Sequence, residues 1–364
     1  ISSTTETTLN HGTGYLILIR GDRSIDLTNN DDTPTETTLS SSGSLFTGTQ
    51  FLGPSVLNQG DFQAGGNGSS LIANPYQAPV DMEKVLNTSS QINQEFIHVY
   101  DPTLGDRGAF VTVGFGDEAD GSNDDTNFTF GSNSGNDASP TTATRFLQPG
   151  SAVFVNTINP GVDGNASPSI TFNESDKAID NQNSGPFRTS ATRSESDDKR
   201  INITLYDTES LTTGGTPRDG LTIRFSEEYS NTIEMTDAYK AFNLDENFSS
   251  HIDGNDFSIQ SRALPLVNEQ VALSISDFRT FDYTFKAQIN GFDNMNVYLV
   301  DNYSGIQSLI ENNEETQIQF SVNPDQALSV ASDRFNILFE EKVLGIDNNL
   351  ASNFTMYPNP VRQG

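Results

Sequence analysis

The stretch Phe281-Asp-Tyr-Thr-Phe-Lys-Ala-Gln-Ile289 decides the fold class of this chain. Apolar and polar residues alternate along it, and the apolar positions are Phe281, Tyr283, Phe285, Ala287 and Ile289. Successive side chains of a β-strand point to opposite faces, so a period of two is typical of a half-buried antiparallel strand. The stretch therefore predicts one strand with an apolar face toward a core and a polar face (Asp282, Thr284, Lys286, Gln288) toward solvent.

The same alternation recurs in five further segments of the C-terminal half. Their apolar positions are Ile201/Ile203/Leu205, Leu221/Ile223/Phe225, Val271/Leu273/Ile275, Ile318/Phe320/Val322 and Phe335/Ile337/Phe339. Turn-forming clusters such as Thr213–Pro217 and His251–Asn255 separate them. Many short strands with Gly, Asn, Asp and Pro between them indicate sandwiches or jelly rolls. We expect an all-β chain of tandem antiparallel β-sandwich or jelly-roll-like domains with long polar loops.

Segments with other patterns are few. Val80–Leu86 predicts two helical turns, with Asp81 in position to cap them. Thr236–Phe242 predicts a second short turn, and Tyr15–Ile19 is the longest apolar run and suits one buried strand. No run approaches the roughly 18–20 apolar residues of a membrane helix, so no membrane insertion is expected.

Composition divides the chain into two domains. The almost entirely polar stretch 177–200 is interpreted as a linker, with a long sandwich loop as the alternative. The prediction is a β-sandwich domain over 1–176 with an acidic loop insertion at 117–140, a second β-sandwich domain over 201–345, and a linker with the start of another domain over 346–364. The chain begins at Ile1, and we interpret it as a piece of a longer precursor.

Charge and residue usage narrow the function classes. The formal charge is −30, which argues against nucleic acid and bare anionic lipid as partners, because both require a surplus of Lys and Arg. The chain has no cysteine, so disulfides, thiolate metal sites and cysteine nucleophiles are impossible. It also has no tryptophan, which weakens a sugar-binding platform, although Tyr and Phe can stack on sugars as well.

Catalytic motifs are missing from the sequence. The three histidines, His11, His98 and His251, lie far apart and lack metal-ligand spacing. The sequence contains neither a G-x-S-x-G elbow nor a phosphate-binding P-loop. Carboxylates are abundant, but nothing marks the separation and aromatic cleft of a glycosidase pair. We expect a chain that is not an enzyme.

Calcium is the most plausible ligand, because it takes six to eight oxygen ligands and the chain carries oxygen-rich loops. The candidate metal residues are Asp117, Asp120, Asp124 and Asp125, and Asp253–Asp256 supplies a smaller group. Neither group follows the EF-hand order, and the alternative is a solvated acidic loop.

The tail of the chain carries a resemblance to a known family. Phe354-Thr-Met-Tyr-Pro-Asn-Pro-Val361 resembles the opening of the type A C-terminal sorting domain of proteins exported by the type IX secretion system of Bacteroidota. In that family this domain directs the protein across the outer membrane and is then removed. The resemblance implies a sorting signal at Tyr357, Pro358, Asn359 and Pro360, and the alternative is an ordinary proline turn.

Further segments along the chain resemble, in their sequence and their order, a region that precedes such signals in large Bacteroidota surface proteins. They include Leu71–Tyr76 with Pro79–Asp81, Val99–Pro102, Gly108–Thr112, Tyr298–Asp301 and Asp333–Phe335. In that family the region is a non-catalytic β-sandwich stalk or surface module of adhesin-like proteins. We therefore expect a cell-surface or secreted protein exported across the outer membrane. Its implied partners are the type IX translocon and shuttle protein, and an anionic lipopolysaccharide anchor after cleavage.

The alternative function is a carbohydrate-binding module of a secreted glycan-degrading protein. Sandwich folds hold sugars through aromatic side chains and calcium-ordered loops. Phe128, Phe130 and Tyr100 are the candidates for contact with surface glycans, although core packing explains these residues equally well.

Overall fold

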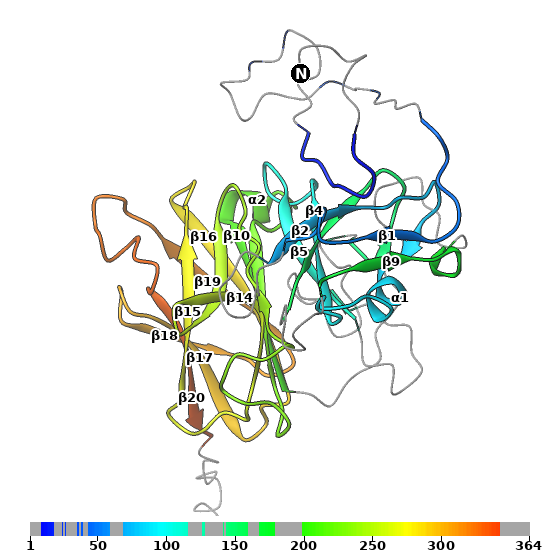
Figure 1. Ribbon diagram of the computed structural model, residues 1–364. Coiled ribbons are helices and arrows are strands. Elements are labelled where there is room, and N and C mark those ends of the chain that lie inside the picture. Colours follow the sequence, from blue (N-terminus) through cyan, green and yellow to red (C-terminus); the bar gives the residue numbers. More distant parts are fainter. Residues whose placement is uncertain are drawn as a thin grey trace, which may run out of the picture.

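The computed structural model describes residues 9–17, 24, 26, 35, 38, 43–58, 68–115, 126–127, 141, 143–158, 167–178 and 199–342. The protein is mainly β, with 45% strand and 6% helix, which confirms the predicted class. The strands form several small antiparallel sheets and one large, nearly closed, barrel-like sheet. We call the described residues of 43–178 the N-terminal module and residues 199–342 the C-terminal module; they lie side by side in Figure 1.

Three antiparallel sheets and one short helix make up the N-terminal module. The sheets are a five-stranded one in the order β2-β8-β4-β5-β6 and the pairs β1-β9 and β3-β7. The elements are β1 (Gln50–Leu52), β2 (Ser69–Ala73), β3 (Val80–Asp81), α1 (Met82–Asn87), β4 (Phe96–Asp101), β5 (Ala109–Gly114), β6 (Thr126–Asn127), β7 (Phe146–Leu147), β8 (Ala152–Asn156), β9 (Ile170–Phe172) and the 3-10 helix η2 (Glu174–Asp176). One hydrophobic cluster, from Leu52 to Phe172, fills the space between them.

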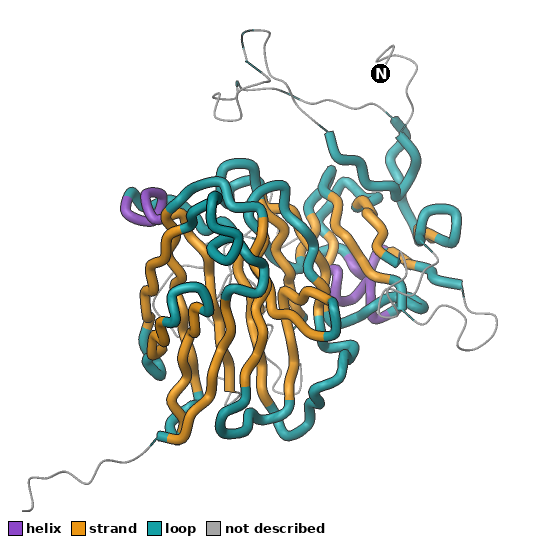
Figure 2. Tube along the Cα trace, turned by 90° about the vertical axis from the view of Figure 1, so that its left-hand side faces the viewer, coloured by secondary structure: helices purple, strands orange, loops and turns teal. Residues whose placement is uncertain are grey.

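The C-terminal module is built around the large sheet. Its strand order is β18-β17-β20-β15-β13-β14-β11-β10-β16-β19, and β12 pairs with β14 beside this path. The elements are β10 (Lys199–Asp207), α2 (Thr208–Thr212), β11 (Asp219–Phe225), β12 (Ala238–Tyr239), β13 (Asn247–Ile252), β14 (Asn255–Arg262), β15 (Gln270–Ser276), β16 (Asp282–Asn290), β17 (Met295–Asp301), β18 (Ile306–Ile310), β19 (Glu315–Ser321) and β20 (Phe335–Glu341). The end strands β18 and β19 follow each other in sequence and touch, so the sheet is nearly closed. Figure 2 shows its long strands running alongside one another.

The alternating segments became strands with buried apolar faces, as predicted. β10, β11, β15, β16 and β20 each contribute apolar side chains that are almost fully buried in one core. Phe281 is an exception, because it precedes β16 and is 64% exposed. Thr284, on the face expected to point to solvent, is fully buried. The predicted turn at His251–Asn255 joins β13 to β14, and its central residues Asp253 and Gly254 both have positive φ. Two such residues match the twist of a two-residue hairpin turn.

Three local predictions are wrong. Thr236–Phe242 contains strand β12 and no helical turn, because Ala238 and Tyr239 pair with β14. Tyr15–Ile17 is exposed and outside any strand; the chain pairs with the edge of β2 only at Thr13 and then leaves that edge. Asp81 occupies the N-cap position of α1, but its side chain makes no capping hydrogen bond, since it lies 3.2 Å from Nε of Arg145 instead.

The predicted linker falls mostly outside the described residues, at 179–198, and so does the acidic insertion apart from β6 (Thr126–Asn127). Each module has its own hydrophobic core, one within 52–172 and the other within 201–339. None of the helices in the described ranges has the length and apolar character needed to cross a bilayer.

Candidate functional site at the module junction

The strongest concentration of polar chemistry lies where the two modules meet. The β4–β5 hairpin of the N-terminal module projects toward the C-terminal module, and its tip is the loop 102–108. Asp101 precedes this loop, and its Oδ1 accepts a hydrogen bond from the backbone N–H of Thr103. Gly108 has a φ of +80° and packs against the ring of Tyr100, where a side chain would collide with the hydroxyl. Local turn chemistry therefore shapes the hairpin tip.

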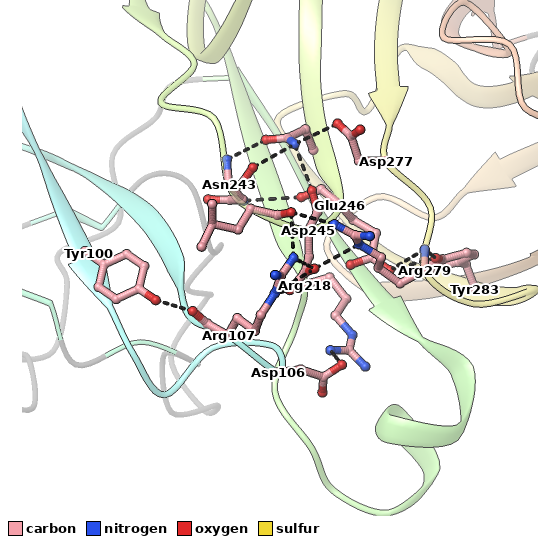
Figure 3. A network of polar contacts seen from close by, with 12 residues as sticks. Tyr100, Asp106, Arg107, Arg218, Asn243, Asp245, Glu246, Asp277, Arg279 and Tyr283 are labelled. Atoms are coloured by element: carbon pink, nitrogen blue, oxygen red, sulfur yellow. Dashed lines mark hydrogen bonds and ion pairs between the residues drawn. The ribbon is translucent and has the colours of Figure 1, made fainter. Parts of the chain in front are cut away.

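Arg107 extends from this tip to Asp245 of the C-terminal module (Figure 3). Its Nε lies 3.0 and 2.9 Å from the two carboxylate oxygens of Asp245, and its Nη2 donates 2.8 Å to the carbonyl of Leu244. Arg279 approaches the same carboxylate, with Nε 2.9 Å from Oδ1. Asp245 thus lies between two guanidinium groups, one from each module.

These contacts shift the ionisation of both partners. Burial alone would raise the pKa of Asp245, but hydrogen bonds and charge from Arg107 and Arg279 outweigh burial and lower the pKa. The hydrogen bond that Arg107 donates to Asp245 raises the pKa of Arg107. Both groups therefore stay charged near neutral pH, and the pair remains an ion pair there.

A second ion pair and several hydrogen bonds extend the junction. Arg218 of the C-terminal module pairs with Asp106 at the hairpin tip. The Thr216 hydroxyl accepts from the Gly105 N–H and donates to the Thr103 carbonyl, both at 3.0 Å. Farther along the hairpin, the N–H of Phe110 donates a hydrogen bond of 2.7 Å to Asn243 Oδ1.

The junction also has a buried part. The hydroxyls of Thr112 and Ser258 hydrogen-bond across it at 2.8 Å, and His98 Nδ1 lies 2.9 Å from the Thr112 hydroxyl. Phe96 packs with Ala238 and Ile259 in a small apolar cluster shared by the modules. Burial, with a smaller contribution from the charge of Lys240, lowers the pKa of His98 to about 3. This histidine is therefore neutral at ordinary pH and lies buried beside Thr112.

A network of this kind joins two bodies through paired charges. Its carboxylates and guanidiniums neutralise one another, and within the described ranges no group of three or more His, Asp or Glu side chains gathers around a shared point as metal ligands would. Glu246, fully buried at its edge, accepts hydrogen bonds from the Tyr283 hydroxyl at 2.7 Å and the Arg279 N–H at 3.1 Å. The junction therefore fixes the orientation of the modules.

The predicted sorting-signal and metal residues are not among the residues that the structure describes. Tyr357, Pro358, Asn359 and Pro360 are outside the described residues, and so are Asp117, Asp120, Asp124 and Asp125. The smaller acidic group is a hairpin turn in which Asp256 hydrogen-bonds His251 at 2.8 Å. Sequence reasoning missed Arg107 and Asp245 because the two are 138 positions apart, and neither stands in a recognisable motif.

One of the predicted sugar-contact residues does line a cavity. Tyr100, with Phe110 and Phe154, forms one wall of a space of about 480 Å³ on the outer side of the five-stranded sheet. Neighbouring rings meet edge to face at 5.3 and 5.5 Å between centroids. Tyr15–Ile17, strand β7 and the segment that joins β7 to β8 also line this space. Phe128 and Phe130 are outside the described residues.

Comparison with known proteins gives one family. The family model described as a domain of unknown function (DUF8693) matches residues 1–339. No curated protein and no solved structure matches the chain.

Proposed function

The chain belongs to the DUF8693 family, and we propose that it is a non-enzymatic β-sandwich stalk or surface module of an adhesin-like protein exported by the type IX secretion system. The observation that carries the proposal is the junction, where Arg107, Asp245 and Arg279 tie the modules together. A spacer that displays other domains needs a fixed relation between its parts. Interfaces between domains within one chain otherwise permit relative motion.

The roles of the resembling segments support a structural function. Arg334 connects two of these segments, Tyr298–Asp301 and Asp333–Phe335. Its Nε and Nη2 each donate a hydrogen bond of 2.8 Å to one carboxylate oxygen of Asp301. In Leu71–Tyr76, the Tyr76 ring is fully buried and its hydroxyl donates 2.9 Å to the Phe172 carbonyl. These residues hold strands together, which is the use a scaffold would make of them.

We propose the sandwich description for the C-terminal module as well. Residues 270–272 of β15 pair with β20, whereas residues 273–276 pair with β13. A strand that passes from one set of partners to another lets a sheet fold over itself around a core. The formal charge of −30 suits a soluble extracellular surface.

The export part of the proposal rests on the tail resemblance. The translocon and its shuttle protein would recognise the sorting domain that opens at Tyr357–Pro360, and cleavage would leave the module released or attached to anionic lipopolysaccharide. Calcium at Asp117–Asp125 remains a prediction of the sequence.

Export can be tested in a Bacteroidota host that carries type IX secretion. We expect the precursor with Tyr357, Pro358, Asn359 and Pro360 all changed to alanine to be lost from the cell surface and retained inside the outer membrane. Protease shaving followed by immunoblotting of cell fractions measures this. A matched change of Asn348 and Asn349 to alanine, outside the motif, should leave display intact. Unchanged surface display of the motif variant would refute the export proposal.

The second candidate, a carbohydrate-binding module, is favoured by the aromatic wall of Tyr100, Phe110 and Phe154. Aromatic faces beside polar rim groups such as Gln148 can hold sugar rings, although these rings meet edge to face and offer no flat platform. A glycan array probed with the chain separates the candidates, because saturable binding of a defined polysaccharide that is lost in Tyr100→Ala favours the second.

A further inference from the structure

The most deeply buried ion pair lies beside the junction, between Lys240 and Asp219. Nζ of Lys240 is 2.6 Å from Oδ1 of Asp219, and the two side chains are 1% and 0% exposed. Asp219 opens β11, and Lys240 directly follows β12. Transfer of two full charges to such a site carries a desolvation cost that only complete hydrogen bonding offsets.

The hydrogen bonds around this pair are unequal. An ammonium group has three N–H donors. Among the described residues, Lys240 Nζ has one hydrogen-bond acceptor, the Asp219 carboxylate. Asp219, in contrast, accepts from Lys240, from the Gly220 N–H at 2.8 Å and from the Phe248 N–H at 2.6 Å. A buried ammonium with two idle donors is costly, whereas an amide nitrogen in the same place is uncharged and carries a single N–H.

We propose that Lys240 and Asp219 condense to an intramolecular amide, a covalent cross-link within the C-terminal module. The uncharged amine nitrogen attacks Cγ of the protonated Asp219 carboxyl, forming the N–C bond. The Cγ–Oδ1 bond breaks, and Oδ1 leaves as water with the carboxyl proton and one amine proton. The product is one amide and one water, and no electron donor or acceptor is required.

The surroundings of the pair favour each part of this step. The Phe248 N–H already donates to Oδ2, where negative charge develops when the nitrogen adds to Cγ. The Gly220 N–H donates to the departing Oδ1. Burial raises the pKa of Asp219 despite the nearby Lys240, which favours the protonated carboxyl. Fixed contact between the reacting groups replaces a bimolecular encounter.

The intact mass of the purified full chain under denaturing conditions tests the proposal. We expect a mass lower than that of the sequence by one water molecule. Trypsin cleaves after Arg218 and Arg224 but not after an acylated Lys240. The digest should therefore contain peptide Asp219–Arg224 joined to peptide Phe225–Arg262, instead of separate peptides that end at Arg224 and Lys240.

Two controls distinguish the cross-link from other losses of water. Lys240→Arg keeps a cation but cannot form the amide, so its mass should equal that of its sequence; Lys286→Arg, at an exposed ion pair, should retain the loss. Cyclisation of Asp219 with Gly220 also releases water, but it leaves cleavage after Lys240 intact. A wild-type chain of full sequence mass, or a water loss without the joined peptides, would overturn the proposal whether or not Lys240→Arg folds.

Discussion

Replacing Arg334 with alanine is expected to destabilise the C-terminal module by about 3–5 kcal/mol, because the change leaves a buried carboxylate without its partner. Arg334 is 3% exposed and binds Asp301 through two parallel hydrogen bonds of 2.8 Å. Its Nη1 also donates to the carbonyls of Ser321 and Ser329, at 3.0 and 2.9 Å. One side chain thus joins the end of β17, the end of β19 and the segment before β20.

Urea denaturation followed by circular dichroism measures this loss as a lower midpoint with an unchanged slope. Lys286→Ala is the matched control, since the pair of Lys286 with Glu315 is partly exposed and should contribute less than about 1 kcal/mol. A loss in Arg334→Ala no larger than in the control would contradict a structural role for the Asp301–Arg334 pair.

The same pair gives the protein an acid-sensitive contribution to stability. Burial alone would raise the pKa of Asp301, but hydrogen bonds from Arg334 and Ser304 outweigh it and lower the pKa. A carboxyl whose pKa is lower in the folded state stabilises the fold above its unfolded pKa of about 3.9. That contribution disappears as the pH falls through the lowered value, and Arg334→Ala should show a smaller loss of stability over this acid range.

Phe285→Ala is expected to cost about 3–5 kcal/mol, the range for removing a fully buried aromatic side chain. Phe285 is fully buried at the centre of β16, and its ring contacts Phe248, Phe320 and Phe335 at centroid distances of 4.8–5.1 Å. The cavity would open among rings contributed by three strands, β13, β19 and β20, which cannot collapse without moving the sheet.

Phe281→Ala is the control from the same sequence stretch. Phe281 is 64% exposed, so its replacement should change the free energy of unfolding by no more than about 0.5 kcal/mol. The thermal midpoints of the two variants check the contrast. Equal shifts would show that the alternating pattern of this stretch does not divide core from surface as described.

The strands were predictable because the alternation of apolar and polar residues that marks them lies within each short segment. In Ile201–Leu205 or Phe335–Phe339, the alternation itself states which side chains enter the core, and the structure buries them. The sequence pattern does not predict the secondary structure where pairing with a distant strand determines it. Ala238 and Tyr239 look helical in sequence but extend as β12 because the edge of β14 is available to them.

The junction was not predictable for a related reason. Arg107 stands in a turn and Asp245 in a loop, and each alone is an ordinary solvated charge. Only the direction of the β4–β5 hairpin brings them together, and that direction depends on packing in both modules. Asp81 illustrates the same limit, since the long-range partner Arg145 takes the side chain that local rules assign to a helix cap.

The two modules are expected to form one rigid unit, and the distribution of distances between a label on each module measures this. The chain has no cysteine, so Asn87→Cys at the end of α1 and Gln319→Cys in β19, both exposed, give two unique sites for nitroxide labels. Pulsed electron–electron double resonance should show one narrow distribution of nitroxide–nitroxide distances in the otherwise unaltered chain. The distribution should be broader when Asp245→Ala and Arg218→Ala remove both junction ion pairs. A broad or multiple distribution in the unaltered chain would contradict the account.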